Sequence, residues 1–288
     1  KQFDIDQACF LARAGFVGLA TDLYKEREGY KYADRAPTDQ DTPEQREACF
    51  KGAFDSMNAL LREPKTWRGL MAEYLRLAFQ HPSVAEGRAG AIGYCLGGQC
   101  CLEQLRGGQP VQVLTTFHGL LHSRPMHKDD GYNSYRRLTQ EEYEKEVDVP
   151  PTTCTPECVL VIENGGHDAE VPPESIGAFM MEMDAHQVDW RFNFYARTPH
   201  GWALAPSCPG GGGNYREVQD RRSTESMLAS FAEVWPDVEQ YHVEANACGT
   251  KLRKSKTSSS SRSASDVVTL ALAVLVAAAA VLFRLRLG

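Results

Sequence analysis

The 288-residue sequence predicts an α/β protein built on a mostly parallel, doubly wound sheet. Short apolar runs suited to buried strands alternate with stretches of helical periodicity, which favours parallel strands joined by crossover helices on both faces. Hydrophobic residues make up 42% and charged residues 24% of the chain, as in an ordinary globular domain with a sizeable core. The expected strands are 16–20, 89–93, 111–116, 159–162 and 191–195.

The first expected element is a helix near the N-terminus. Asp4 or Asp6 can cap this helix, and Gly15 ends it before the first strand. The sequence shows no start methionine, so we expect it to begin partway through a longer protein. The apolar face of the helix is expected to carry Ile5, Ala8, Cys9 and Ala12.

Three further helices are predicted between the strands. After a polar loop from Asp22 to Pro43, apolar residues recur at helical spacing over 49–61 and again over 67–78. The second of these helices stops before Pro82, because the residue before a proline disfavours the helical conformation. A third helix, over 176–186, separates the last two strands and completes the alternating pattern.

Net charge and cysteine spacing exclude several classes of protein. The formal charge of -7 and the isoelectric point near 5.7 argue against a nucleic-acid partner, since such proteins usually present a basic surface. Nine irregularly spaced cysteines do not form a disulfide framework and favour a reducing compartment. Cys154 and Cys158 could supply half of a metal site, but no second pair completes it at zinc-like spacing. We therefore expect neither a metal nor another cofactor.

Composition divides the chain into three parts. Residues 1–245 are expected to form the α/β domain, and residues 246–265 are a serine-rich basic linker with little to bury. Residues 266–286 contain an uncharged run, 267–283, that as a helix would cover about 25 Å, the short end of a bilayer span. We predict a single-pass transmembrane helix at the C-terminus, with the domain on the cytosolic side of the membrane. A removed lipid-anchor signal and an alanine-rich buried or amphipathic helix are the alternatives.

The clearest chemical signal is a cysteine between the second strand and a helix. Gly93 and Gly97 flank Cys95 at two residues on each side, which lets strand and helix approach closely in the strained turn known as a nucleophile elbow. A helix N-terminus lowers the pKa of a thiol from about 8.5 and so favours the reactive thiolate. We predict Cys95 as a nucleophile. The alternative is a small buried cysteine, the role expected for Cys100 and Cys101.

Candidate partners for Cys95 follow two later strands. In folds with this elbow the nucleophile, the acid and the histidine occur in that order, each in a loop after a strand. Asp168 follows the fourth strand and is the candidate acid, and His200 follows the fifth strand and is the candidate base. His167 and His118 also follow strands and remain candidates for a supporting role.

Four segments together resemble the dienelactone hydrolase family of the α/β-hydrolase superfamily. They are Ala20-Thr21-Asp22-Leu23-Tyr24, Gln45-Arg46-Glu47, Gly93-Tyr94-Cys95-Leu96-Gly97-Gly98, and His200-Gly201 with the upstream Asp168. The resemblance runs from about residue 3 to about residue 240 and implies Cys95 as nucleophile, Asp168 as orienting acid and His200 as base. It also implies that Arg46 binds a substrate carboxylate through two parallel N–H donors, although an ordinary surface arginine is equally consistent with the sequence.

Two departures from the family limit this comparison. The bacterial members have a second substrate arginine four residues beyond the histidine, where Leu204 stands here. They also have a strand and a glutamate-containing loop that would lie before Lys1 and would supply one oxyanion donor. The other donor is expected to be the backbone N–H of Leu96, the residue after the nucleophile. Trp202, close to His200, is a further candidate for substrate contact.

The sequence therefore predicts a membrane-tethered hydrolase of small carboxylic esters or lactones. A thioesterase or acyl transferase on the same three residues and a non-catalytic binding module are the alternatives. The charged and tyrosine-rich segment 122–151 is expected either to shape the pocket entrance or to be a solvated loop. The glycine run 210–213 lacks the spacing of a phosphate cradle and is expected to form a flexible loop near His200.

Overall fold

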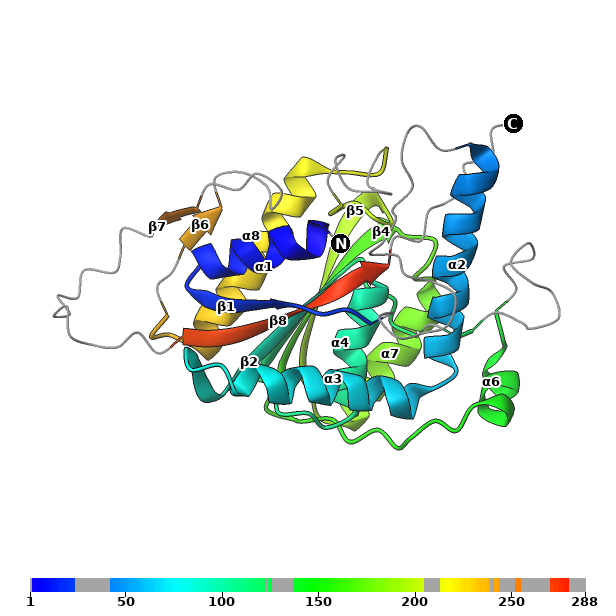
Figure 1. The fold of residues 1–288 in the computed structure, drawn as a ribbon, viewed down its shortest axis with the longest axis horizontal. Coiled ribbons are helices and arrows are strands. Elements are labelled where there is room, and N and C mark those ends of the chain that lie inside the picture. Colours follow the sequence, from blue (N-terminus) through cyan, green and yellow to red (C-terminus); the bar gives the residue numbers. More distant parts are fainter. Residues whose placement is uncertain are drawn as a thin grey trace, which may run out of the picture.

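The computed structural model describes residues 2–23, 42–122, 124–125, 137–204, 213–238, 241–243, 252–254 and 270–279. Within these residues a six-stranded sheet lies between two layers of helices (Figure 1). Every neighbouring pair in this sheet is parallel, which confirms the predicted α/β class. The strands, in spatial order, are β1 (Phe16–Ala20), β8 (Leu270–Ala279), β2 (Val84–Cys95), β3 (Val113–Phe117), β4 (Val159–His167) and β5 (Asp189–Pro199).

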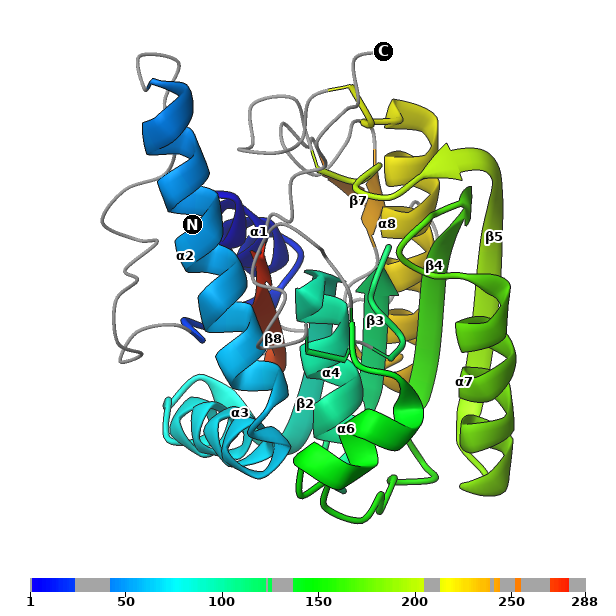
Figure 2. The same ribbon diagram turned by 90° about the vertical axis from the view of Figure 1, so that its right-hand side faces the viewer.

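Four helices build the larger core on one face of the sheet (Figure 2). They pack apolar side chains such as Trp67, Met71 and Phe179 against Ala91 and Leu114 of the strands. The side chains of Trp67, Met71 and Phe179 are at most 1% exposed, so this layer excludes water from the face that carries the elbow. The helices are α2 (Pro43–Leu61), α3 (Pro64–Phe79), α4 (Leu96–Arg106) and α7 (Pro173–Ala185).

Helices α1 (Gln2–Arg13) and α8 (Glu217–Val234) cover the opposite face. The predicted apolar face of the first helix is wrong, because Ile5 is 50% exposed and Cys9 is exposed as well. Larger aromatic side chains on another face bury more apolar area and so decide which side meets the sheet. The buried apolar residues of α1 and its end are Phe3, Phe10, Leu11 and Ala14.

Three strands extend further than the sequence predicted, among them β2, which was expected over 89–93 and spans Val84–Cys95. The glycine segment before Asp168, expected to be a loop, continues β4 as far as His167, and β5 continues to Pro199. Gly165 permits this extension, because a Cβ there would lie 2.2 Å from the backbone oxygen of Thr198. The longer strands deliver the acid and the histidine to the same edge of the sheet.

The C-terminal segment differs most from its prediction. Residues 270–279, expected within a membrane helix over 266–286, form β8 in the interior of the sheet. A run of aliphatic residues fits a strand buried on both faces as well as a helix in lipid, and apolar periodicity does not separate the two. The remaining residues of the predicted helix lie outside the described residues. None of the described helices combines the length and the hydropathy needed to cross a bilayer.

Two small features complete the description. Strands β6 (Tyr241–Val243) and β7 (Leu252–Lys254) form an antiparallel ribbon within the region predicted as the end of the domain and the linker. Helix α6 (Gln140–Glu146) lies in segment 122–151 and is closed at its N-terminus by a capping box between Thr139 and Glu142. The glycine run 210–213 and the loop 24–41 fall outside the described residues, apart from Gly213.

Candidate active site

The turn at Cys95 has the geometry expected of a nucleophile elbow. Cys95 ends β2 and precedes α4, with φ 55° and ψ -121°, a backbone conformation that a non-glycine residue rarely adopts. Its neighbours must be small, because a Cβ on Gly93 would lie 2.1 Å from the Gly97 oxygen. A Cβ on Gly98 would likewise lie 2.5 Å from the Cα of Gly119. Close packing of the backbone on both sides therefore holds Cys95 in its strained position.

The structure brings Cys95, His200 and Asp168 together in one hydrogen-bonded line. His200 Nε2 lies 3.2 Å from the Sγ atom of Cys95. On the other side of the ring, His200 Nδ1 lies 3.0 Å and 2.9 Å from the two carboxylate oxygens of Asp168. The three side chains come from the ends of β2, β5 and β4 and are buried, with 2%, 5% and 6% of the residue surface exposed. This is the arrangement in which a carboxylate orients an imidazole toward a thiol.

Electrostatics favour a proton on the imidazole of His200. Burial lowers the pKa of His200, but the charge of Cys95 and the hydrogen bonds with Asp168 and Cys95 more than offset it, so the pKa lies well above its ordinary value. The Asp168 carboxylate is held in place by the backbone N–H of Glu170, which donates to its Oδ1 at 2.9 Å. His200 Nε2, at 3.2 Å from the Cys95 sulfur, is therefore placed to exchange a proton with this side chain.

The loop after β3 supports both the nucleophile and the base. The backbone N–H of Leu120 donates to the Cys95 carbonyl at 3.2 Å. The ring of His118 is fully buried, with its centroid 5.0 Å from that of His200, and burial followed by the charge of His200 places the pKa of His118 well below its usual value. His118 is thus a neutral neighbour of the base, whereas His167 is exposed at the end of β4.

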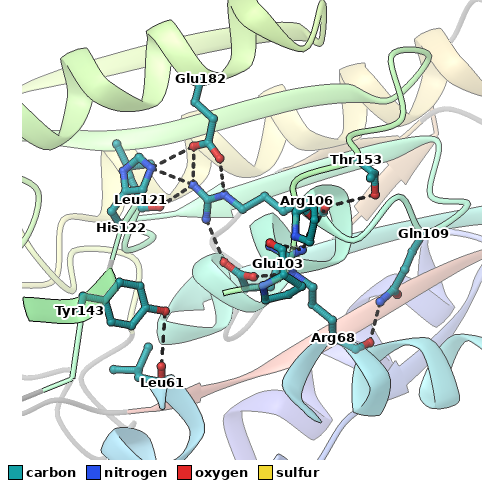
Figure 3. Close-up of polar contacts among 12 residues, drawn as sticks. Leu61, Arg68, Glu103, Arg106, Gln109, Leu121, His122, Tyr143, Thr153 and Glu182 are labelled. Carbon is teal, nitrogen blue, oxygen red and sulfur yellow. Dashed lines mark hydrogen bonds and ion pairs between the residues drawn. The ribbon is translucent and has the colours of Figure 1, made fainter. Parts of the chain in front are cut away.

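A buried ionic network, which sequence patterns did not indicate, holds this loop against α4 and α7 (Figure 3). Arg106, at the end of α4, donates from Nε and Nη2 to the two carboxylate oxygens of Glu182, each at 2.8 Å. Its Nη1 donates to Glu103 at 3.1 Å, and its Nη2 donates to the carbonyl of Leu121 at 3.1 Å. Only the spacing of Glu103 and Arg106 on one helix was visible in the sequence. The partners in α7 and in the loop are distant along the chain.

Other residues singled out from the sequence take varied positions. Arg46 lies in α2, and its side chain is outside the described part of the structure. Trp202 is fully buried, with its ring centroid 5.8 Å from His118 and 5.1 Å from Tyr195, so it packs behind the site. Leu96 begins α4, where the first N–H groups have no partner within the helix and can serve an oxyanion. Leu204 is buried and brings no charge to the region.

Four cysteines outside the elbow have raised thiol pKa values. Burial raises the pKa of Cys154 to about 11 and places the pKa of Cys158 well above its ordinary value. The same cause raises the pKa of Cys100 and Cys101. These four cysteines are protonated near neutral pH, which makes them poor nucleophiles and poor metal ligands.

The parallel sheet and the turn at Cys95 are the features of an α/β-hydrolase-like fold. The profile of the dienelactone hydrolase family matches residues 4–235. The chain therefore belongs to the dienelactone hydrolase family, as the resemblance implied. A search of curated proteins gave no match.

Three hydrolases are among the solved structures that match this chain. A dienelactone hydrolase-like promiscuous phosphotriesterase from metagenomic libraries is 24% identical, with a TM-score of 0.43 over 58% of this chain and 61% of that chain. A dienelactone hydrolase from Klebsiella pneumoniae is 15% identical, with a TM-score of 0.45 over 73% and 72% of the two chains. A carboxylesterase from Lactobacillus plantarum is 15% identical, with a TM-score of 0.40 over 57% and 65%. The chain thus spans less than two thirds of the first of these proteins.

Proposed function

We propose that the protein hydrolyses carboxylic esters or lactones with Cys95 as nucleophile, His200 as base and Asp168 as the orienting acid. The observation that carries the proposal is the line of contacts from Cys95 Sγ through both ring nitrogens of His200 to the Asp168 carboxylate, at 3.2 Å and 2.9 Å. Membership of the dienelactone hydrolase family supports a hydrolase of ester-type substrates. The alternatives on the same residues are transfer of the acyl group to another acceptor and hydrolysis of a thioester.

In the first half of the proposed reaction the Cys95 thiolate attacks the carbonyl carbon. The carbonyl π electrons move to oxygen, and the oxyanion accepts a hydrogen bond from the Leu96 N–H. The carbonyl then reforms, the C–O bond to the alcohol breaks, and the alcohol oxygen takes the proton from His200 Nε2. With a lactone, this alcohol remains attached to the acyl group.

In the second half His200 Nε2 accepts a proton from water, whose oxygen attacks the thioester carbon. When the carbonyl reforms, the C–S bond breaks and the sulfur leaves as a thiolate beside the imidazolium. The acid is released and the starting ion pair is restored. Asp168 keeps its charge throughout and holds the ring in one orientation.

The test is ester hydrolysis combined with mass spectrometry of the enzyme. Cys95→Ala and His200→Ala are each expected to lower the rate on 4-nitrophenyl acetate by about 10⁴-fold, as loss of one member of such a unit does. An acetyl adduct on Cys95 that persists in His200→Ala supports the two-step route. Cys9→Ala is the control, because Cys9 is exposed and lies far along the chain from the elbow. Hydrolysis that survives Cys95→Ala would exclude the proposed nucleophile.

Two outcomes point to the alternatives. Faster turnover when an alcohol or amine acceptor replaces water would favour an acyl transferase, and a strong preference for thioesters would favour a thioesterase. Absence of both turnover and a Cys95 adduct, in a chain that melts cooperatively, would favour a binding module that keeps the fold.

We also propose that residues 266–286 can attach the protein to a membrane. The support is the uncharged run 267–283, closed by Asp266 and by Arg284 and Arg286, whose long side chains can reach the polar boundary. Placing residues 270–279 in β8 and placing them in lipid are mutually exclusive. Sedimentation with phosphatidylcholine vesicles decides, because membrane insertion requires co-sedimentation that resists carbonate washing. A chain that stays in the supernatant would rule out the anchor.

A further inference from the structure

The two edges of the central sheet differ in how far their strands are exposed. No residue of β1, at one edge, is exposed, whereas β5, at the other edge, has five exposed residues. Within the described part of the chain β5 pairs only with β4, so its outer side faces no other strand (Figure 2). The unpaired backbone N–H and C=O groups of an edge strand can bind another strand. The exposed residues of β5 are Asp189, Arg191, Phe194, Ala196 and Arg197.

The edge formed by β5 is regular and rich in aromatic residues. From Asp189 to Tyr195 its register with β4 is unbroken, and this stretch contains neither proline nor lysine, two residues that protect natural edge strands. Phe194 is 54% exposed, and its ring stacks on that of Phe192 with the centroids 4.8 Å apart. A regular, aromatic edge of this kind favours pairing with a further strand.

Helix α7 adds apolar surface next to this edge (Figure 2). The helix is tied to β5 by Trp190, whose Nε1 donates to Asp184 Oδ1 at 2.8 Å. Met181 of α7 is 75% exposed, and Gly177, about one turn earlier, is exposed as well. Strand and helix thus both present apolar surface to solvent, which is the composition expected at the core of an interface between proteins.

We propose that β5 is the interface between two copies of this chain, which pair through their β5 strands in antiparallel orientation. A two-fold axis through Asn193 relates the copies, so each residue lies opposite the residue that is equally far from Asn193 on the other copy. Phe192 then lies opposite the partner's Phe194, an aromatic cross-strand pair that occurs twice. The interface contains none of the three proposed catalytic residues, so the inference does not rest on the proposed function.

Charges at the two ends of β5 select this register. Asp189 begins the strand and Arg197 lies near its end, and neither forms an ion pair with another described residue. With the axis at Asn193, Asp189 of each copy lies opposite the partner's Arg197. Moving the axis by one residue toward the C-terminus places Arg191 opposite the partner's Arg197, where like charges repel. A strand whose ends carry opposite charges is complementary to itself in antiparallel pairing, which argues for a second copy of the chain over another partner.

The first test is a disulfide across the two-fold axis. Opposing residues of antiparallel strands have their Cα atoms about 4.5 to 5.5 Å apart, within the reach of a disulfide. Oxidation of the full chain carrying Asn193→Cys with copper phenanthroline is expected to convert most of it into a covalent dimer. The unsubstituted chain is the control for the native cysteines, and Leu77→Cys, at a 46% exposed position on α3, is the control for random collision. No more covalent dimer in Asn193→Cys than in Leu77→Cys would overturn the proposal.

The second test measures the dissociation constant of the dimer by light scattering of the full chain after gel filtration. Phe194→Lys is expected to raise this constant at least about tenfold, because a charge replaces an aromatic side chain within the interface. Leu77→Lys places the same charge on α3 and should leave the constant unchanged. A chain that is monomeric at every concentration, or a dimer weakened equally by both lysines, would contradict the proposal.

Charge reversal tests the register. Asp189→Lys is expected to raise the dissociation constant about fivefold, a modest effect because the pair is exposed. Adding Arg197→Asp should restore most of the affinity, and aspartate tolerates the φ of 56° at this position better than most residues do. No restoration in the double variant would rule out the pairing about Asn193. Vesicle binding that Phe194→Lys abolishes, in a chain that stays monomeric, would mean that a lipid surface covers this edge, and the proposal would fail.

Discussion

The two halves of the central sheet are assembled from different kinds of neighbours. From β2 to β5 each strand lies beside the next strand of the chain, and a crossover segment joins the pair. On the other side, β8 comes from the C-terminal end of the sequence and lies between β1 and β2. Local patterns can predict the first arrangement, because successive strands of α/β units usually pair, but they carry no information about the second.

The halves meet at the proposed nucleophile. Cys95, the last residue of β2, is opposite Ala279, the last residue of β8. The acid and the histidine belong wholly to the other half, on β4 and β5. The elbow is therefore supported on one side by short-range connections and on the other by a strand brought from the end of the chain.

The largest expected effect comes from a proline in β8. Val274 pairs with Leu19 of β1 and with Ala91 of β2, so Val274→Pro removes a backbone donor from the interior of the sheet. We expect a loss of at least about 3 kcal/mol in the free energy of unfolding, measured by urea denaturation of the full chain. Ser260→Pro, in the predicted linker, is the control and should cost almost nothing.

Val274→Pro also distinguishes the two structures considered for residues 270–279, strand β8 and a membrane helix. A membrane helix tolerates proline far better than an interior strand does, because local rearrangement and nearby groups satisfy the freed backbone atoms. An unfolding free energy that does not change in Val274→Pro, together with co-sedimentation with vesicles, would mean that residues 270–279 serve the membrane and not the sheet. The two halves would then not be joined through β8.

Much of the fold could be predicted because short sequence patterns identify its strands and helices. The strands that became β1 to β5 are apolar runs bounded by turns, and the helices between them show helical spacing. The failures have physical causes. The buried face of α1 carries Phe3 and Phe10, whereas Ile5 is exposed. Both faces of this helix have apolar residues, so the sequence of the helix alone does not show which face packs against the sheet. Whether residues 270–279 form a strand depends on the space between β1 and β2, which are far from these residues in the sequence.

The residues of the candidate site likewise fall into those that the sequence could predict and those that it could not. Cys95, Asp168 and His200 could be named because each follows a strand, and the carboxyl ends of parallel strands meet at one edge. The roles of those residues remain proposals. The pairing of Arg106 with Glu182 could not be predicted, since the two residues are far apart in the sequence and an isolated charge is usually solvated.

A smaller loss of unfolding free energy is expected when the ionic network around Arg106 is broken, in the half of the molecule built on β2 to β5. Burial raises the pKa of Glu182, but hydrogen bonds from Arg106 and His122 more than offset it and hold the pKa far below its ordinary value. A carboxyl whose folded pKa is depressed stabilises the protein above its unfolded pKa of about 4.3, and this contribution is lost as the pH falls below that value. We expect Glu182→Gln to cost about 3 kcal/mol of unfolding free energy at pH 7, because the buried Arg106 loses the carboxylate that accepts two of its hydrogen bonds and keeps only Glu103 as an anionic partner among the described contacts.

The pH dependence distinguishes this mechanism from simple loss of packing. Between pH 5 and pH 3 the wild type should begin to lose the stability that Glu182 supplies, and the remainder should be lost only at still lower pH, where the folded carboxyl takes up its proton. The difference in unfolding free energy between wild type and Glu182→Gln should therefore start to narrow over this range. Glu225→Gln, which breaks the exposed pair with Arg221, should cost less than about 1 kcal/mol at every pH. A gap that stays constant from pH 7 to pH 3 would show that the charge of Glu182 does not stabilise the end of α4.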